Sequence, residues 1–238
     1  MRLLGAQELE SHEWEPWQTY AFESFKNKLT DRKNPFPCIP AVQGLSLGHL
    51  RFVFVDKPND ALDQKKLAKI LKDYSLGYKE YGKYTSLIIF FNYVGSFDIK
   101  DYEKLFWDQL TLLHRLDESS WPRHISPDPE HPTWEFCFQG VPYFVYCATP
   151  EHRHRKSRSF PFMLLALTPR SVFNEFRANE KHAEKIKAQT RKRLAAYDEV
   201  PIHPSLNTYG KNDNFEWKQY FLPDDQGVQG KCPFKHKW

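Results

Sequence analysis

The sequence lacks the features of a membrane-spanning or secreted protein. No stretch approaches the roughly 18 consecutive apolar residues of a transmembrane helix. The N-terminal run MRLLGAQELESHEWEPW has no apolar core of the kind that a signal peptide needs. The four cysteines, Cys38, Cys137, Cys147 and Cys232, show neither CxxC pairing nor the spacing of a disulfide framework. We therefore expect a soluble, cytoplasmic protein that has no membrane partner.

The common catalytic signatures are absent as well. The chain contains no glycine-rich phosphate loop, no GxSxG, no HExxH and no paired CxxC. These absences argue against the usual hydrolases, kinases, dinucleotide enzymes and zinc enzymes. The net charge of +4 is too small, for 238 residues, to indicate binding to nucleic acid.

Large aromatic side chains are abundant. The chain has 19 Phe, 12 Tyr and 7 Trp, and 40% of its residues are hydrophobic, which is enough for a sizeable core. Aromatic rings usually fill cores, although they also suit flat ligands. With no internal repeat and no clear linker, we expect one domain over residues 1–238, in which residues 1–33 form an N-terminal helical extension.

Hydrophobic periodicity predicts alternating helices and strands, followed by strands that are adjacent in sequence. Because the later strands have no helical crossover between them, we expect an α+β fold with a largely antiparallel or mixed sheet and helices packed on one face. The C-terminal segment, rich in Pro, Gly and Asp, is expected to be long and irregular. Helices are predicted around 17–29, 67–74, 105–116 and 171–197, and strands at 50–56, 85–93, 162–169 and in a hairpin around Gly140.

The densest polar cluster is TPEHRHRKSRSF at 149–160, which lies between two predicted strands. It holds His152, His154, Arg155 and Arg158 within a few residues. Arginine can pair in a bidentate manner with carboxylates or phosphates, and a neutral histidine can bind a metal. The alternative is a solvated basic loop, since runs of charge are usually exposed.

Two isolated residues are further candidates. Glu135 lies inside an aromatic strand, where a carboxylate either faces water or is held in a pocket that grips a cation or a guanidinium group. Cys38 follows a proline in FPC, and such a cysteine is either a small core residue or, alternatively, a thiolate ligand or a reactive thiol.

The chain resembles a known family through several blocks that occur in the same order. They are FPCIPAV, LRFVF, WPRHISPDPEHPTWEFCFQGVPYFV, TPEHRHRKSRSF, LTPRSVF and HPSLNTYG with EWKQYFLPDD. From about Asn34 to its end, the chain is identified on these blocks as similar to the YqcI/YcgG family. Some members of that family resemble haem-dependent N-oxygenases that hydroxylate guanidino or amino nitrogens of arginine-like compounds. Where haem-using relatives carry His-Pro, this chain has Thr149-Pro150.

The resemblance implies a haem-dependent oxygenase with a small-molecule substrate and a redox partner. In that reading His152 is the first choice for the axial iron ligand, and Cys38 is the alternative. Arg155, Arg158 and His154 would bind the cofactor, the two arginines by pairing with its propionates. Glu135 would hold the guanidinium or ammonium group of the substrate near the iron. The competing hypothesis is a non-enzymatic protein that binds an anionic small ligand or acts through protein interactions.

Overall fold

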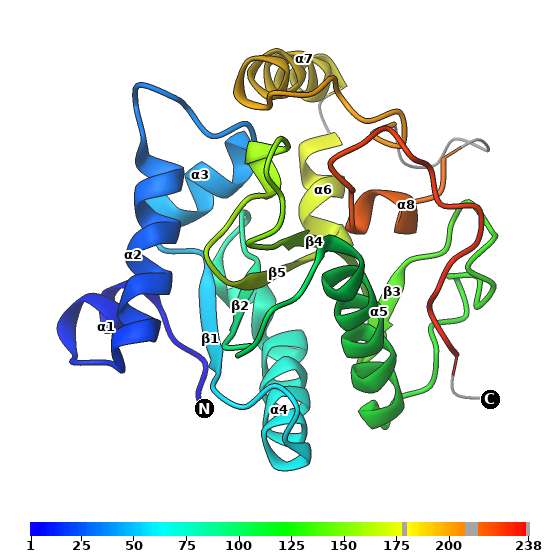
Figure 1. The fold of residues 1–238 in the computed structure, drawn as a ribbon. Coiled ribbons are helices and arrows are strands. Elements are labelled where there is room, and N and C mark those ends of the chain that lie inside the picture. Colours follow the sequence, from blue (N-terminus) through cyan, green and yellow to red (C-terminus); the bar gives the residue numbers. More distant parts are fainter. Residues whose placement is uncertain (178–179, 208–213, 237–238) are drawn as a thin grey trace.

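The computed structural model describes residues 1–177, 180–207 and 214–236. Helices and strands alternate in the first half of the chain, and the strands of the second half follow one another directly (Figure 1). The helices are α1 Ala6–Ser11, α2 Pro16–Thr30, α3 Ile39–Ser46, α4 Ala61–Gly77, α5 Ile99–Leu116, α6 Arg170–Arg177, α7 Glu180–Tyr197 and α8 Trp217–Tyr220. The strands are β1 Arg51–Val55, β2 Leu87–Phe91, β3 Phe136–Phe138, β4 Val141–Ala148 and β5 Met163–Pro169.

The five strands form one mixed sheet in the order β1-β2-β5-β4-β3. Strands β1 and β2 are parallel and are joined through α4, whereas the other neighbours are antiparallel. β3 pairs with only the first residues of β4, from Val141 to Tyr143, so the rest of β4 has no strand on its outer side. These pairings confirm the predicted α+β fold with a mixed, largely antiparallel sheet.

Helices cover both faces of this sheet, which corrects the expectation that they pack on one face. Helices α4 and α5 pack on the face that carries Val53, Ile89 and Leu165. Helix α2 packs on the opposite face, on Phe52 and Phe90 (Figure 1). Successive side chains of a strand point to opposite faces, and apolar residues occupy both sets of positions here. A sheet of this composition needs a cover on each side.

Local sequence signals explain where the long helices begin. The Asp60 side chain accepts hydrogen bonds from the backbone N–H groups of Leu62 and Asp63 at the start of α4. Asp98 and Asp101 form a reciprocal capping box at the start of α5. Each cap satisfies backbone donors that have no partner within the helix.

The C-terminal segment from Asp198 onward is mostly irregular, as expected, and its described part contains only the short helix α8. It runs along the open side of β4 and back towards α5 (Figure 1). Within the described ranges, no helix combines the length and the apolar character that crossing a membrane requires.

Candidate functional site

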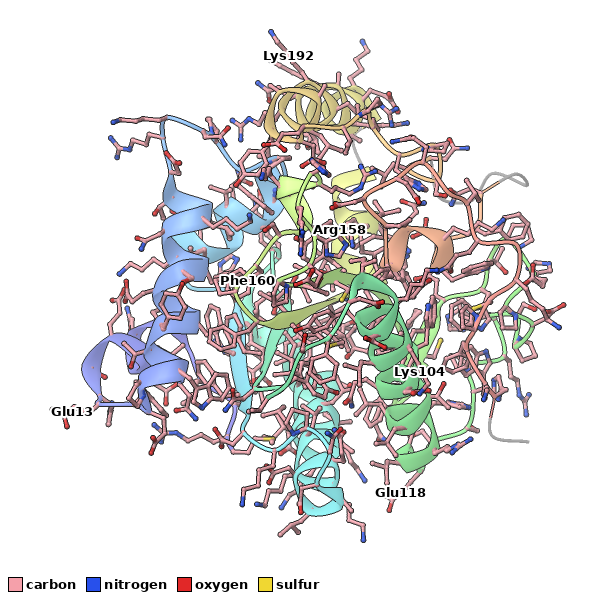
Figure 2. The ribbon with its side chains drawn as sticks, viewed as in Figure 1. Glu13, Lys104, Glu118, Arg158, Phe160 and Lys192 are labelled. Carbon is pink, nitrogen blue, oxygen red and sulfur yellow. The ribbon has the colours of Figure 1, made fainter. Side chains whose placement is uncertain are left out.

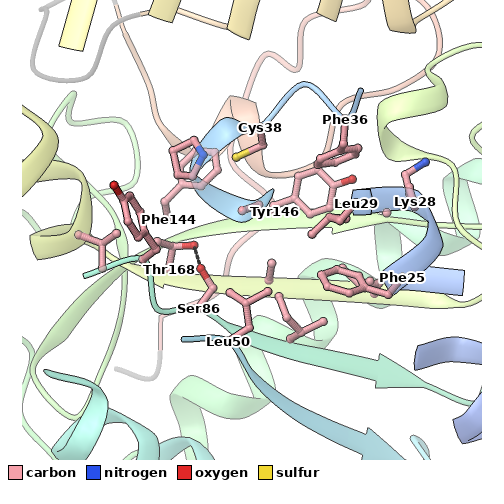
Figure 3. A pocket seen from close by; sticks show the side chains of 18 of the residues that line it. Phe25, Lys28, Leu29, Phe36, Cys38, Leu50, Ser86, Phe144, Tyr146 and Thr168 are labelled. Atoms are coloured by element: carbon pink, nitrogen blue, oxygen red, sulfur yellow. Dashed lines mark hydrogen bonds between the residues drawn. The ribbon is translucent and has the colours of Figure 1, made fainter. Parts of the chain in front are cut away.

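An apolar cavity lies between the sheet and the helices α2, α3 and α6 (Figure 3). Its floor is formed by the side chains of β2, β4 and β5 that point to this face, and residues of α2 and α3 cover it. The rings that line it are Phe25, Phe36, Tyr84, Phe144, Tyr146, Phe160 and Phe173. Its volume is about 160 Å³. This is smaller than the roughly 300–1,000 Å³ of pockets that hold cofactors and drug-sized ligands.

The cavity exists because small side chains stand where a packed sheet would carry large ones. Ser86, Ala148 and Ala166 all face it from the floor. Ala166 and Thr168 are partly accessible although β5 is a central strand with neighbours on both sides. Leu165 and Leu167, which point to the opposite face of the same strand, are fully buried. The accessibility of Ala166 and Thr168 is therefore confined to the cavity face and comes from the empty space above it.

Cys38 places a thiol in the wall of this cavity (Figure 3). It stands immediately before α3, at the N-cap position of that helix. It is the exposed member of the four free cysteines, whereas Cys137, Cys147 and Cys232 are buried. Because its accessible surface faces the cavity and protein surrounds it, burial raises the pKa of the Cys38 thiol. The Ala41 backbone and the charge of Arg158 act in the opposite direction.

Lys28 supplies a cation among the lining residues. Its Nζ donates to the carbonyl oxygens of Lys156 at 2.8 Å and Ser159 at 3.0 Å. It also lies over the rings of Phe36 and Tyr197. Burial lowers the pKa of Lys28 to about 8, partly offset by Asp198. An ammonium group makes three hydrogen bonds, so an anionic group near the rim could take the third N–H of Lys28.

The floor of the cavity also carries a pair of hydroxyl groups. Ser86 Oγ and Thr168 Oγ1 are hydrogen-bonded at 2.6 Å, from the start of β2 and the end of β5 (Figure 3). They give an otherwise apolar surface a place where a polar group could be oriented.

His152, the first choice for an iron ligand, is fully buried outside this cavity lining. Its Nε2 lies 2.8 Å from the carbonyl oxygen of Leu222, which can only accept, so Nε2 carries the proton. Nδ1 therefore accepts from the Thr149 hydroxyl, also at 2.8 Å. Burial lowers the pKa of His152 to about 4, which keeps the ring neutral. In this arrangement neither ring nitrogen presents a lone pair to a metal.

The two arginines chosen for the cofactor connect the 149–158 segment to the C-terminal segment. Arg158 donates to the carbonyl oxygens of Cys147, Gln219 and Tyr220 at 2.7–3.0 Å. Its guanidinium group lies over the Tyr146 ring, 4.2 Å from the centroid. Figure 2 shows Arg158 above the sheet, and its side chain is buried. Arg155 is equally buried, and its guanidinium donates to the carbonyl oxygens of Pro223, Pro201 and Asp225.

His154 lies on the surface of the same segment. Its Nδ1 is 3.2 Å from a carboxylate oxygen of Glu199, and the side chain is mostly exposed. The 149–158 segment is therefore neither a solvated basic loop throughout nor a row of free cations. The buried Arg158 satisfies a carbonyl of β4 on its open side, and both arginines satisfy carbonyls of the C-terminal segment.

Glu135 is fully buried and binds a guanidinium group, that of Arg170. Arg170 Nε lies 2.7 Å from Glu135 Oε2, and its Nη2 lies 3.0 Å from Glu216 Oε2. Neither Glu135 nor Arg170 is among the residues that line the cavity. Of the site residues chosen from the sequence, Cys38 is the one that the cavity contains.

Sequence reasoning missed the other cavity residues, notably Lys28, Ser86, Tyr146 and Ala166. A weak signal was present in the alternation of β4 and β5, which assigns Tyr146 and Ala166 to one face. Nothing in that alternation reveals that the cover over this face leaves a space.

Within residues 1–177, 180–207 and 214–236, no group of three or more His, Cys, Asp or Glu side chains is placed to hold a metal ion. A haem iron differs from such sites, because the macrocycle provides four nitrogens and the protein needs to add only one axial ligand. A single thiol in an aromatic cavity is chemically sufficient for that task.

Comparisons with known proteins agree over almost the whole chain. A family model described as the YqcI/YcgG family matches residues 25–235. Two relatives from Bacillus subtilis, the uncharacterized proteins YqcI and YcgG, are 46% and 43% identical over 92% of this chain and 87% and 88% of their own lengths. A Streptomyces lavendulae protein, the putative N(omega)-hydroxy-L-arginine synthase DcsA, is 29% identical over 92% of this chain and 84% of its own. No solved structure gives a significant match.

Proposed function

The chain belongs to the YqcI/YcgG family, and on that premise we propose that it is a haem-dependent oxygenase that hydroxylates a nitrogen of an arginine-like guanidino or amino compound. The nitrogen chemistry is suggested by the name of the Streptomyces relative, an N(omega)-hydroxy-L-arginine synthase. The observation that carries the haem is the Cys38 thiol, which faces an apolar cavity lined by aromatic rings.

In this proposal the Cys38 thiol would hold the haem iron. A coordinated thiol loses its proton outright, so iron would overcome the burial that raises the Cys38 pKa in the empty cavity. His152 is a poorer candidate because both ring nitrogens already take part in hydrogen bonds of 2.8 Å. The place of Cys38 at the N-terminus of α3 also favours a negative charge on sulfur.

The lining has the apolar and aromatic character that suits the rest of the macrocycle. Phe36, Phe144 and Tyr146 offer apolar rings for its faces. Lys28, rather than Arg155 and Arg158, would pair with a propionate of the macrocycle. Its Nζ donates two hydrogen bonds to backbone carbonyls, which leaves a third N–H for a carboxylate at the rim of the cavity. The guanidinium groups of the two arginines are already directed to backbone carbonyls.

The reaction balances with dioxygen and an external reductant. An N–H bond of the substrate becomes N–OH, the second oxygen atom leaves as water, and two electrons and two protons are consumed. When bound, the haem supplies oxygen activation, which a thiolate ligand promotes by donating electron density. The chain excludes water with its aromatic walls, and the hydroxyl pair of Ser86 and Thr168 can orient a polar nitrogen or pass a proton into the dry cavity.

The test is the visible absorption of the purified protein before and after addition of hemin. We expect a Soret band in the wild type. Its ferrous carbonyl complex should absorb at the markedly longer wavelength that distinguishes thiolate from imidazole ligation. Cys38→Ala should lose this thiolate signature, whereas His152→Gln and the cysteine control Cys232→Ala should keep it.

The oxygenase activity is measured in a separate assay. Hemin-loaded protein with arginine, dioxygen and a reducing system should yield a product that has gained one oxygen atom, detected by mass spectrometry. A wild-type protein that takes up no hemin would overturn the proposal. So would a Soret band and carbonyl spectrum that are the same in Cys38→Ala.

A further inference from the structure

A second hollow lies on the opposite side of the molecule from the cavity, between α5 and the C-terminal segment 229–235. It is an open groove with polar walls, unlike the apolar cavity. Its lysines are Lys100 and Lys104 from α5 and Lys231 and Lys235 from the C-terminal segment. All four side chains are exposed.

The groove carries an excess of positive charge. Two acids, Glu103 and Asp108, accompany the four lysines. Lys104 pairs with Asp108 at 2.6 Å. Burial, followed by the nearby Asp225, raises the pKa of Glu103. Lys100, Lys231 and Lys235 have no ion pair among the described residues.

The inner wall of the groove includes Trp107, which is 3% exposed. Its ring stacks on Tyr220 with centroids 6.3 Å apart and planes at 24°. Tyr220 meets Phe144 edge to face at 5.5 Å. Phe144 lines the cavity that contains Cys38.

These three rings form a continuous series of contacts from the groove to the cavity. The three rings pass the edge of the sheet beside the part of β4 that has no β3 partner. Helix α8 packs against β4 there. Phe136, in the last pair of β3 and β4, donates its backbone N–H to the Tyr220 hydroxyl, and that hydroxyl donates to the carbonyl of Tyr143. These two bonds hold the Tyr220 hydroxyl against the β3 and β4 backbone.

We propose that this groove is the docking surface for an acidic one-electron carrier protein, and that Trp107, Tyr220 and Phe144 bridge its redox centre to the cavity. The inference rests on the proposed function, whose reaction consumes two electrons from an external reductant. The carrier delivers them one at a time and is itself oxidised by one electron in each encounter. Electrons cross packed atoms far better than empty space, and the ring series provides contact throughout.

The partner is acidic because complementary charge steers association and selects orientation. Exposed charges act over about 8–10 Å at physiological salt, which is enough for the four lysines to act on one carrier surface. Binding should weaken as salt is added, because exposed charges are screened.

The test uses a purified acidic flavodoxin as the probe, with the full-length protein with and without hemin. Lys100→Glu combined with Lys231→Glu should weaken binding by at least about tenfold at low salt. Lys65→Glu combined with Lys69→Glu is the matched control. It makes the same change in net charge at exposed positions of α4, and should bind nearly as tightly as the wild type.

Electron delivery is then followed by stopped-flow reduction of the hemin-loaded protein. The groove variant should lose rate in parallel with affinity. Trp107→Leu should slow reduction at saturating carrier, while Trp107→Phe, which keeps a ring, should slow it less.

Equal losses in the groove variant and the α4 control would overturn the inference, because they would indicate net charge alone. Binding of inorganic phosphate without binding of the carrier would also overturn it. The proposed function is judged by the hemin spectrum, so its failure is seen separately. Hemin uptake without salt-sensitive carrier binding rejects the docking surface alone, and carrier binding without hemin uptake rejects its redox role.

Discussion

Filling the cavity should make the empty protein more stable and prevent it from binding hemin. Ala166 is the residue to change, since it lies on the cavity floor in the central strand β5 and is partly accessible there. In Ala166→Leu, three further carbons would occupy space that is now empty. At about 0.8 kcal/mol per buried methylene, the gain is about 2.4 kcal/mol. Fixing the leucine rotamer takes back roughly 0.5–1 kcal/mol.

The expected net effect is a rise of about 1.5–2 kcal/mol in the free energy of unfolding of the hemin-free protein, measured by urea denaturation. Hemin titration of the same variant should show no Soret band. A gain in stability with a loss of binding is typical of a site that is kept open for a ligand.

Ala21→Leu is the matched control. Ala21 of α2 is completely buried in the same hydrophobic cluster, and it does not line the cavity. The larger side chain should overpack this site and lower the free energy of unfolding by about 1–3 kcal/mol. If Ala166→Leu destabilises as much as Ala21→Leu, the space above β5 is not usable. If it takes up hemin normally, the cofactor binds elsewhere.

Two further predictions concern the 149–158 segment. The pKa of His152 is about 4 in the folded protein, below the usual 6.5, so the unfolded chain binds more protons between these values. The contribution of His152 to the free energy of unfolding is therefore fully present above pH 6.5, and the free energy of unfolding falls by about 3 kcal/mol towards pH 4. Urea denaturation across this range should give a shallower decline for His152→Gln, and parallel profiles would contradict the assignment. Arg158→Met should lower the free energy of unfolding by about 3 kcal/mol or more, since it leaves three buried carbonyls without donors. The exposed Arg153→Met should change it by less than about 0.5 kcal/mol, and equal effects would show that burial of Arg158 is unimportant.

Local pattern was enough to locate most elements of the fold. The apolar run at 85–93 contains β2, and the spacing of Trp17, Ala21, Phe25 and Leu29 is that of helix α2. Such elements follow from short-range periodicity, because helices and strands place side chains at fixed intervals. The number of helix-covered faces does not follow from it. The apolar residues of β1 and β2 needed a cover on both sides, which only the packing of α2 against α4 and α5 made visible.

For the site, the sequence by itself supplied the reactive residue types and the family, including the FPC cysteine that the structure places in the cavity. It could not rank Cys38 above His152, because the partners of His152 lie at Thr149 and, 70 positions away, at Leu222. Likewise the sequence left Glu135 either facing water or gripping a cation or guanidinium in a pocket, because its partner Arg170 is 35 positions away.

A polar group can contact a ligand only where empty space lies beside it, and that space exists only in the folded chain. The size of each side chain is written in the sequence, and so is the alternation that puts Ala148 and Ala166 on one face of the sheet. Whether that face is filled depends on how α2, α3 and α6 approach it, through contacts between residues far apart in the chain. Only the tertiary structure therefore determined that Cys38 faces a cavity while the arginines of 149–158 hold the backbone together.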